Sequence, residues 1–364
     1  MDNQNINQAS QATVVKRESK NKIRVDFERT PLLERLRKKY LSVFFLQQVI
    51  WVFFRFVLML GISFIILFPF LAQITGSFMS PEDFIDTMVQ MVPRNPTTET
   101  YRAIIIENQY WLAVRNTAIL AGMAAVSQML ICTIVGYGFS KFKFKGNKLF
   151  FMLVILTLLI PHQTLQFSLF MRFRYFDIFD WFGQGNGIIG LINQHFRGIT
   201  RVQDMSINFI NTYWPLALLS LSGLAFKNGL YILMMRQFFK GVPDELEEAA
   251  YVDGAGVFRT FFTIIIPLSI PMMVTVFLFA FTWQWTDEFY VNLFTTEAGP
   301  HLIPRIVQIP RSLMLHPLAT QAGTMYQSAI RNTCGLLIIA PIVLVYLVGQ
   351  RFLIQGIERS GITG

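Results

Sequence analysis

Four carboxylates crowd the beginning of the short stretch between Gly241 and Gly254: Asp244, Glu245, Glu247 and Glu248. Carboxylates favour the first turns of a helix, where the positive end of the macrodipole lies. Pro243 suits a first helical position, and Gly254 can adopt the left-handed conformation that ends a helix. The stretch predicts a compact helix over 243–254, with an ordinary surface loop as the alternative. One face of that helix would suit a partner's groove; it carries Leu246, Ala249, Ala250 and Asp253.

Catalytic chemistry finds little support among the remaining polar residues. The four histidines are scattered without metal-ligand spacing: His162, His195, His301 and His316. No Walker A pattern occurs, so ATP would have to be bound by a partner. The Gly185-Asn-Gly-Ile-Ile-Gly190 segment matches a dinucleotide pattern by letters, but it follows no predicted strand, and we interpret it as a turn. We expect no catalytic residue, metal or cofactor in this chain.

Aromatic and acidic residues combine at the end of one apolar run. Trp283, Asp287 and Tyr290 share one helical face, at steps of four and three residues, and Trp285 lies on a neighbouring face. Aromatic rings stack on the C–H faces of sugars, and carboxylates accept bonds from hydroxyl groups. The set therefore indicates a sugar path. The alternative is the belt of Trp and Tyr found at membrane interfaces.

Three amides near or inside apolar runs are further candidates for this path: Asn116, Gln163 and Gln166. They could line a polar chamber, or they could hydrogen-bond between helices, and the sequence does not separate the two.

Composition sets the class of protein that must position these residues. Of 364 residues 53% are hydrophobic, and the mean hydropathy is +0.45, which predicts an integral membrane protein. The net charge of +9 lies beside apolar runs, so basic membrane flanks explain it better than nucleic-acid binding. Cys132 and Cys334 lie far apart in apolar runs and are expected to be small buried hydrophobes.

The apolar runs predict an all-α, polytopic fold with six transmembrane helices. A basic N-terminal arm with an amphipathic helix occupies 1–52, the membrane domain 53–354 and a tail 355–364. The amphipathic helix could lie on the membrane surface or simply extend the first span into the cytoplasm. The expected spans are 53–74, 114–138, 149–171, 212–236, 265–287 and 333–354.

Basic residues set the expected orientation. They are concentrated in the arm and in the loop between Lys141 and Lys148, so both segments are expected in the cytoplasm. Both termini and the loop 243–267 then lie inside as well. The loops 75–113, 172–211 and 288–330 face outward and are expected to form folded caps.

With these residues in view, the acidic stretch resembles a known signature. Glu248-Ala-Ala250, Gly254 four residues later, and Ile264-Ile-Ile266-Pro267 are similar to the EAA motif of ABC importer permeases, with Ile266 where the family has Leu. Further matches resemble the sugar-importing, maltose-type branch, and they are Trp111-Leu112, Asn116-Thr117, Tyr137–Ser140, Met235–Phe239, Trp285, Asp287–Phe289, Arg351-Phe352 and Gln355-Gly356. The resemblance covers about 54–364.

The resemblance implies a type I ABC importer permease fold with its core at about 112–350 and a coupling loop at 241–264. It implies a second homologous permease, two ABC ATPase subunits that bind ATP and Mg, and an extracytoplasmic solute-binding protein. The residues implied to meet the ATPases are Glu247, Glu248, Ala249, Ala250, Asp253, Gly254 and Pro267, with the tail residues Gln355, Gly356, Ser360 and Gly361.

The leading hypothesis is therefore a non-enzymatic permease subunit of an ATP-driven sugar importer in a bacterial inner membrane. An importer of the same design for another solute is the nearest rival. An ion-driven carrier would place ionisable groups at mid-membrane, and few occur in the spans. A membrane enzyme acting on lipid-linked glycans would need a catalytic constellation that the sequence does not show.

Overall fold

The computed structural model describes residues 43–177, 207–296 and 298–361. Within these ranges the regular structure is helical, apart from one isolated β-bridge between Phe176 and Ile207. The predicted all-α class is therefore confirmed for the described part of the chain. The predicted amphipathic helix near the N-terminus, the Gly185–Gly190 segment and most of the loop 172–211 lie outside these ranges.

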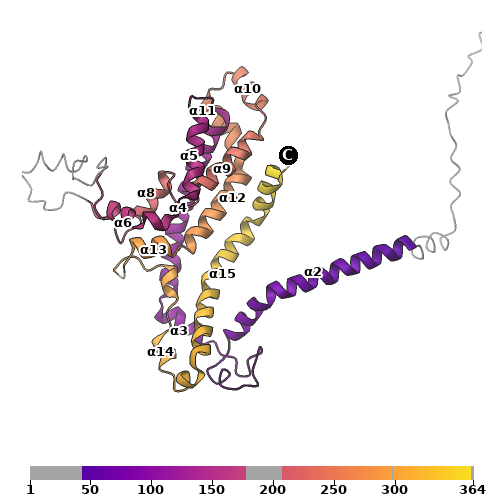
Figure 1. Cartoon of the computed structure of the whole chain (residues 1–364), viewed down its shortest axis with the longest axis vertical. Coiled ribbons are helices and arrows are strands. Elements are labelled where there is room, and N and C mark those ends of the chain that lie inside the picture. The colour runs from indigo at the N-terminus through magenta and orange to yellow at the C-terminus, as the bar shows by residue number, and fades with distance from the viewer. Residues whose placement is uncertain (1–42, 178–206, 297, 362–364) are drawn as a thin grey trace, which may run out of the picture. The chain divides into compact units, whose positions relative to one another are not determined.

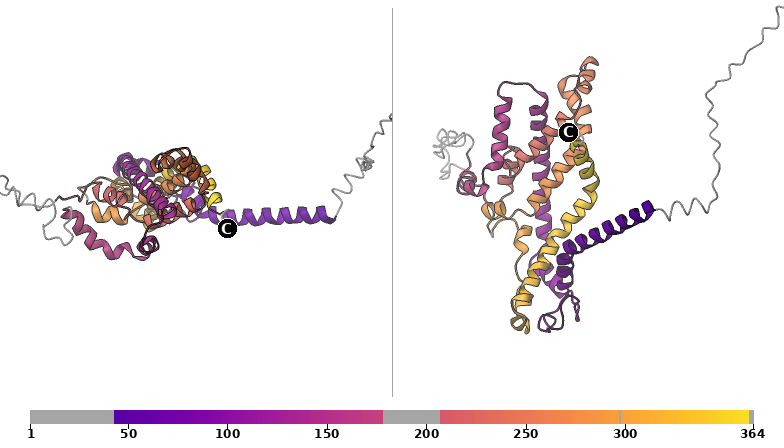
Figure 2. Two further views of the ribbon diagram at one scale, coloured as in Figure 1. Left: turned by 90° about the horizontal axis from the view of Figure 1, so that it is seen from above. Right: turned by 45° about the vertical axis from the view of Figure 1, so that its right-hand side comes forward.

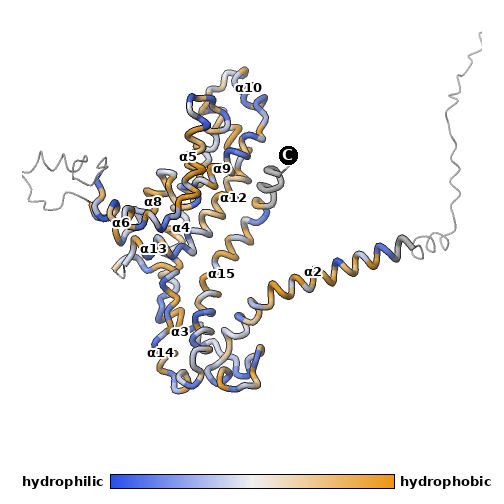
Figure 3. The backbone as a smooth tube through the Cα atoms, viewed as in Figure 1, coloured by the Kyte–Doolittle hydropathy of each residue, from blue (hydrophilic) through white to orange (hydrophobic). Residues whose placement is uncertain are grey.

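The chain divides into two compact units, 1–68 and 69–364, at a point inside the long helix α2 (Val43–Gly76). Pro69, which lies within this helix, begins the second unit. The described part of the first unit is the stretch 43–68 of α2, which is apolar along most of its length (Figure 3). Its most apolar window has a mean hydropathy of 2.5, so lipid is its expected surrounding.

Four long helices form the centre of the second unit: α4 (Tyr110–Lys141), α9 (Asn228–Lys240), α12 (Ile266–Trp285) and α15 (Ala319–Gly361). α4 packs against both α9 and α12, and α15 runs along the other side of α12 (Figures 1 and 2). Small residues allow this close packing. A Cβ atom at Gly136 would lie 2.6 Å from the Cβ of Met235, so α4 and α9 meet at a glycine.

Among the described residues four helices are long and apolar enough to cross a membrane: Gln47–Gly76, Tyr110–Lys141, Val257–Trp285 and Ala319–Leu353. They contain the predicted first, second and sixth spans. The predicted fifth span, 265–287, begins earlier, at Val257, and ends at Trp285. The described part thus gives four such helices, or five if one bent pair counts as a span, and the count of six stays a prediction.

The predicted third span, 149–171, is that bent pair. α5 (Asn147–Leu159) meets the segment formed by η1 (His162–Leu165) and α6 (Gln166–Arg174) at an angle of 92°. The break lies at Pro161, and the residue before a proline is pushed out of the α conformation. Ile160 is accordingly extended, with ψ 116°. The apolar count along this segment did not reveal the bend.

The predicted fourth span, 212–236, is interrupted. α8 (Trp214–Leu221) and α9 are separated by a turn in which Gly223 and Lys227 have φ of +76° and +69°. A left-handed lysine cannot continue a helix. Lys227 and Asn228 are polar residues inside this apolar run, and the break in the structure falls at them.

Two of the segments predicted as outer caps are folded. The 75–113 segment contains α3 (Glu99–Glu107), and the 288–330 segment contains α13 (Phe289–Phe294), η3 (Ile303–Ile306) and α14 (Arg311–Met314). α3 packs on α4, α14 and α15.

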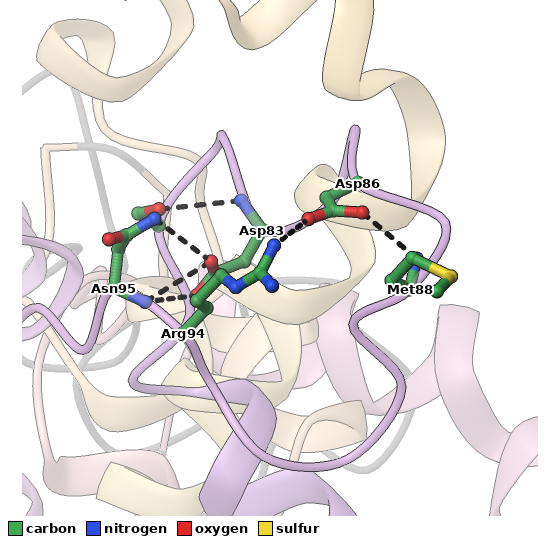
Figure 4. Close-up of polar contacts among 6 residues, drawn as sticks. Asp83, Asp86, Met88, Arg94 and Asn95 are labelled. Atoms are coloured by element: carbon green, nitrogen blue, oxygen red, sulfur yellow. Dashed lines mark hydrogen bonds and ion pairs between the residues drawn. The ribbon is translucent and has the colours of Figure 1, made fainter.

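Carboxylates organise the helix-free loop before α3 (Figure 4). The two oxygens of Asp83 accept bonds from the Asn95 backbone N–H at 3.2 and 3.1 Å, and Oδ1 also accepts from the Asn95 amide. Arg94 pairs with Asp86 at 2.8 Å, and Asp86 accepts the backbone N–H of Met88 at 2.9 Å. The loop therefore has a defined shape that carries an exposed Met88.

Candidate functional site

The acidic stretch forms α10 (Glu245–Val252), a short helix between α9 and α12 (Figure 1). It begins two residues after Pro243, later than the sequence predicted. At its end the Gly254 N–H donates to the Tyr251 carbonyl, and the Ala255 N–H donates to the Ala250 carbonyl. This pair of bonds is the Schellman motif, and Gly254 has the left-handed φ of +80° that it requires. The predicted helix and its glycine stop are confirmed.

One cation ties α10 to the membrane helix α4. Lys141, the last residue of α4, donates from Nζ to the Val242 carbonyl at 2.7 Å and to Asp244 Oδ1 at 2.5 Å. Glu247 Oε1 lies 3.8 Å from the same nitrogen. The Lys141 side chain is only 7% exposed, so this ammonium group is enclosed by its acceptors.

The two faces of α10 differ. Glu247 and Ala250 are buried against the chain itself, whereas Glu248, Ala249 and Asp253 are exposed. The predicted small-residue face is therefore split, because Ala250 points inward. Apolar side chains also remain exposed on α10 and the turn after it; they are Leu246, Tyr251, Val252, Val257 and Phe258.

Burial decides how Lys141 affects its two acidic partners. The hydrogen bond from Lys141 lowers the pKa of Asp244, whose side chain is 77% exposed. For Glu247 burial is the larger effect and raises the pKa, although the charge of Lys141 opposes it. An exposed carboxylate keeps its hydration and gains a partner, whereas a buried one first loses its hydration.

Pro267 does not begin the following span. A continuous helical segment runs from Val257, through α11 (Val257–Thr260) and the π-helical turn η2 (Phe261–Ile265), into α12. The Ile266 N–H donates to the Phe261 carbonyl, five residues back. This wider turn precedes Pro267, where a proline's missing N–H and bulky ring would disrupt a regular helix.

Three of the predicted path residues come together around a second feature, a cavity of about 230 Å³. Trp283, Asp287 and Tyr290 line it from the end of α12 and from α13, and α4 and α8 complete its wall. Asp287 accepts from the Gln284 amide at 3.3 Å and from the Tyr290 N–H at 3.2 Å. Burial raises the pKa of Asp287 to about 6.

The cavity also contains polar groups that the sequence reasoning missed. Gln128 is buried in the middle of α4, where its amide Nε2 donates to the Ser220 hydroxyl at 3.4 Å and its Oε1 has no hydrogen-bond partner. Gln284 is likewise buried and lines the wall. The sequence does contain a signal that could have identified Gln128, because it is an amide side chain inside a long apolar run.

A cation and a histidine lie at the edge of this cavity. Lys227 Nζ lies 4.5 Å from the Phe226 ring centroid and 4.8 Å from that of Trp283. His162 Nδ1 is 2.6 Å from the Tyr290 hydroxyl. The bend after α5 and the turn before α9 thus deliver polar residues to one place. The polar residues Lys227 and Asn228 indicate the turn before α9, but hydropathy does not reveal the bend after α5, so the sequence could not bring these residues together.

The remaining path candidates lie elsewhere. Trp285 is 2% exposed, and its indole N–H donates to the Ile338 carbonyl at 3.0 Å, so it packs α12 on α15. The Asn116 amide donates to the His301 carbonyl at 3.0 Å. Gln163 and Gln166 are exposed on η1 and α6. None of these four is in the cavity wall.

The predicted tail residues lie at the end of α15, which extends to Gly361. Gln355, Gly356, Ser360 and Gly361 are helical, and their side chains are outside the description. Cys132 and Cys334 are buried free thiols, as expected of small hydrophobes. Within the described ranges no three His, Cys, Asp or Glu side chains gather as metal ligands.

Comparison with known proteins connects these features. A family described as "Binding-protein-dependent transport system inner membrane component" matches residues 128–359, well over half of the chain and including α10 and most of the cavity wall. The chain belongs to this family. It is a multi-pass inner-membrane permease with no catalytic role of its own, and the resemblance drawn from the EAA signature is confirmed.

Relatives of this permease are similar over most of their length. It is 26% identical over 314 residues to the galactooligosaccharides transport system permease protein GanQ of Bacillus subtilis (strain 168), covering 85% of this chain and 95% of GanQ. It is 25% identical to the trehalose/maltose permease protein MalG of Thermococcus litoralis, covering 85% and 97%. It is also 25% identical to the sn-glycerol-3-phosphate permease protein UgpE of Salmonella typhi, covering 85% and 96%.

A solved structure shows the same fold. The permease aligns with a chain in the crystal structure of a bacterial ABC transporter involved in the import of the acidic polysaccharide alginate. The TM-score is 0.58 at 17% identity, with 84% of this chain and 97% of that chain covered. The described helices therefore share the fold of that transporter chain.

Proposed function

We propose that this permease forms half of the translocation pathway of an ATP-driven, binding-protein-dependent importer of sugars or oligosaccharides. Its type I importer fold would then cross the membrane six times. In this proposal the bent segment α5–α6 and the interrupted segment α8–α9 would each provide a crossing besides the four continuous helices. Both termini lie in the cytoplasm, together with the basic residues of the arm.

One observation carries the proposed coupling mechanism. α10 is anchored on one face by Lys141 and the buried Ala250, while the other face, with Glu248 and Ala249, is open. A short helix that is fixed on its own side and exposed on the other can transmit the movement of a docked partner. Closure of ATP-bound ATPase subunits would draw the α10 helices of the two permeases together and open the pathway outward.

The proposed assembly contains a second homologous permease, two ABC ATPase subunits and an extracytoplasmic solute-binding protein. ATP and Mg bind to the ATPase subunits, because this chain has no Walker A pattern. Gly254 ends the coupling helix, and Gln355, Gly356, Ser360 and Gly361 extend toward the ATPases.

The cavity supports a sugar as the solute. Trp283 and Tyr290 offer ring faces, and Asp287 and Gln128 offer oxygen acceptors for hydroxyl groups. About 230 Å³ is smaller than a typical ligand pocket of roughly 300–1,000 Å³. The second permease would therefore complete the binding chamber.

A non-sugar solute is the second candidate, and the similarity to a glycerol-3-phosphate permease favours it. The acidic wall distinguishes the two, because Asp287 and Glu288 would repel a phosphate when ionised. Competition of unlabelled neutral oligosaccharides and of sn-glycerol 3-phosphate against uptake by the assembled importer separates them. Competition by the phosphate alone would overturn the assignment to sugars.

Substitution of Glu248 tests the proposed coupling. Glu248→Ala should reduce ATP-driven uptake by about tenfold or more, as expected when a central interface contact of roughly 1.4 kcal/mol or more is lost. Membrane insertion should be unchanged, because this side chain is exposed. Glu245→Ala, also exposed on α10, is the matched control. Full uptake by the Glu248 variant would contradict the coupling role.

A further inference from the structure

Four segments meet at the last turn of α4. The backbone after α9 is bound through the Val242 carbonyl, and the start of α10 is bound through Asp244 and Glu247. One turn earlier on α4, the ring of Tyr137 lies 5.5 Å from Phe239 of α9 and 4.8 Å from Phe261 of η2. The end of this membrane helix is therefore the place where α10 is held to the core.

Lys141 is the charged centre of that junction. An ammonium group has three N–H donors, and the Val242 carbonyl and Asp244 take two of them. Glu247 Oε1 lies 3.8 Å from the same nitrogen, at ion-pair distance; this buried oxygen makes no hydrogen bond to a described residue, and Tyr137 is another polar side chain that interacts with Glu247. A buried carboxylate without a cation is strongly unfavourable, so movement of α10 relative to α4 would break a favourable pair.

From this junction we infer that Lys141 is a positioning residue that makes α10 and α4 move as one body. Glu247, predicted from the sequence to contact an ATPase, is instead the buried partner of Lys141 in this ion pair. It does not face a docked subunit. The inference rests on the proposed coupling role of α10. In this arrangement the exposed Glu248 receives the movement, and Lys141 passes it to the helix that lines the cavity through Gln128.

Loss of coupling between α4 and α10 and misfolding of the protein have different effects on ATP hydrolysis and uptake. If Lys141 only supported folding, its loss would lower the amount of complex, ATP hydrolysis and uptake together. If it couples the helices, the assembled complex still hydrolyses ATP but moves less solute for each ATP. The ratio of solute imported to ATP hydrolysed, measured per assembled complex, therefore separates the two roles.

The experiment uses the complete importer in proteoliposomes, with its native partner subunits and binding protein. Lys141→Met should lower the transport-to-hydrolysis ratio by about tenfold, as expected from truncating one member of a buried charge pair. Lys141→Arg should restore most of it, because the cation remains. Lys145→Met removes the same charge from an exposed side chain of the same loop and should leave the ratio unchanged.

Charge exchange keeps the test decisive if Lys141→Met assembles poorly. Lys141→Glu and Glu247→Lys should each lower the ratio, and the double variant should recover part of it. A wild-type ratio in Lys141→Met, or no recovery in the arginine variant and the double variant, would overturn the inference. If Glu248→Ala also transports normally, the coupling role of α10 itself is wrong. If Glu248→Ala loses transport but the Lys141 variants do not, only the positioning role of Lys141 is wrong.

Discussion

The α10 segment and the cavity at Asp287 are built in different ways. α10 is local: its acidic start, its exposed face and its Gly254 stop lie within a dozen or so consecutive residues. The cavity is assembled from α4, α8, α12 and α13, which are far apart in the chain. The spacing of residues along the sequence is therefore enough to predict α10, which we propose receives the movement of the ATPase. The cavity that we propose for the solute depends on how the interrupted helices pack against each other.

The two tryptophans near the cavity give the largest expected contrast. Trp285→Ala should lower the free energy of unfolding by about 3–5 kcal/mol, because it empties a buried site and removes the bond to the Ile338 carbonyl. Trp283→Ala should barely change stability, since this side chain is 49% exposed, but it should raise the KM for uptake. Thermal unfolding in detergent and uptake kinetics measure the two effects.

That contrast also tests the cavity as a site. Equal destabilisation by both substitutions, with an unchanged KM in Trp283→Ala, would make the cavity an ordinary packing defect. The interfacial aromatic belt would then explain Trp283.

A smaller effect is expected from the pH dependence of stability. The folded-state pKa of Asp287 is raised to about 6, so the folded protein binds a proton that the unfolded chain does not bind between about pH 4 and 6. Stability should therefore rise as the pH falls from 7 to 5, by roughly 1 kcal/mol from this group. Asp287→Asn should remove that part of the slope in thermal melts.

Glu288→Gln is the matched control for that measurement, because Glu288 is exposed beside Asp287. It should keep the wild-type slope. An unchanged slope in Asp287→Asn would show that this carboxylate is hydrated in the folded protein and does not belong to an enclosed chamber.

Much of the fold was predictable because the length of an apolar run and the polar residues that end it are local features of the sequence. α4, α10 and the glycine stop followed from such signals, and so did the polar interruption at Lys227. The 92° bend at Pro161 did not, because hydropathy counts residues and ignores the conformation that a proline imposes on its neighbour. The start of the fifth span was placed too late because a π-helical turn carries the helix past Pro267.

The site residues also differ in whether local spacing or packing between helices determines their position. Glu248 and Ala249 are exposed as a docking face requires, whereas Glu247 and Ala250 turn inward, with Glu247 3.8 Å from Lys141 on another helix. Trp283, Asp287 and Tyr290 meet as their helical spacing predicts. Gln128 joins them only through packing between α4 and α12, which spacing within one segment cannot show.

The central claim is that the exposed face of α10 docks on an ATPase subunit, and cross-linking tests it most directly. Both native cysteines are buried, so a cysteine placed at the exposed Ala249 provides the reactive thiol. In the assembled importer, a short bifunctional reagent should join Ala249→Cys to the ATPase subunit. Met88→Cys, exposed on the loop before α3, should not give that product. Absence of the ATPase product at Ala249, with normal assembly and labelling, would contradict the account.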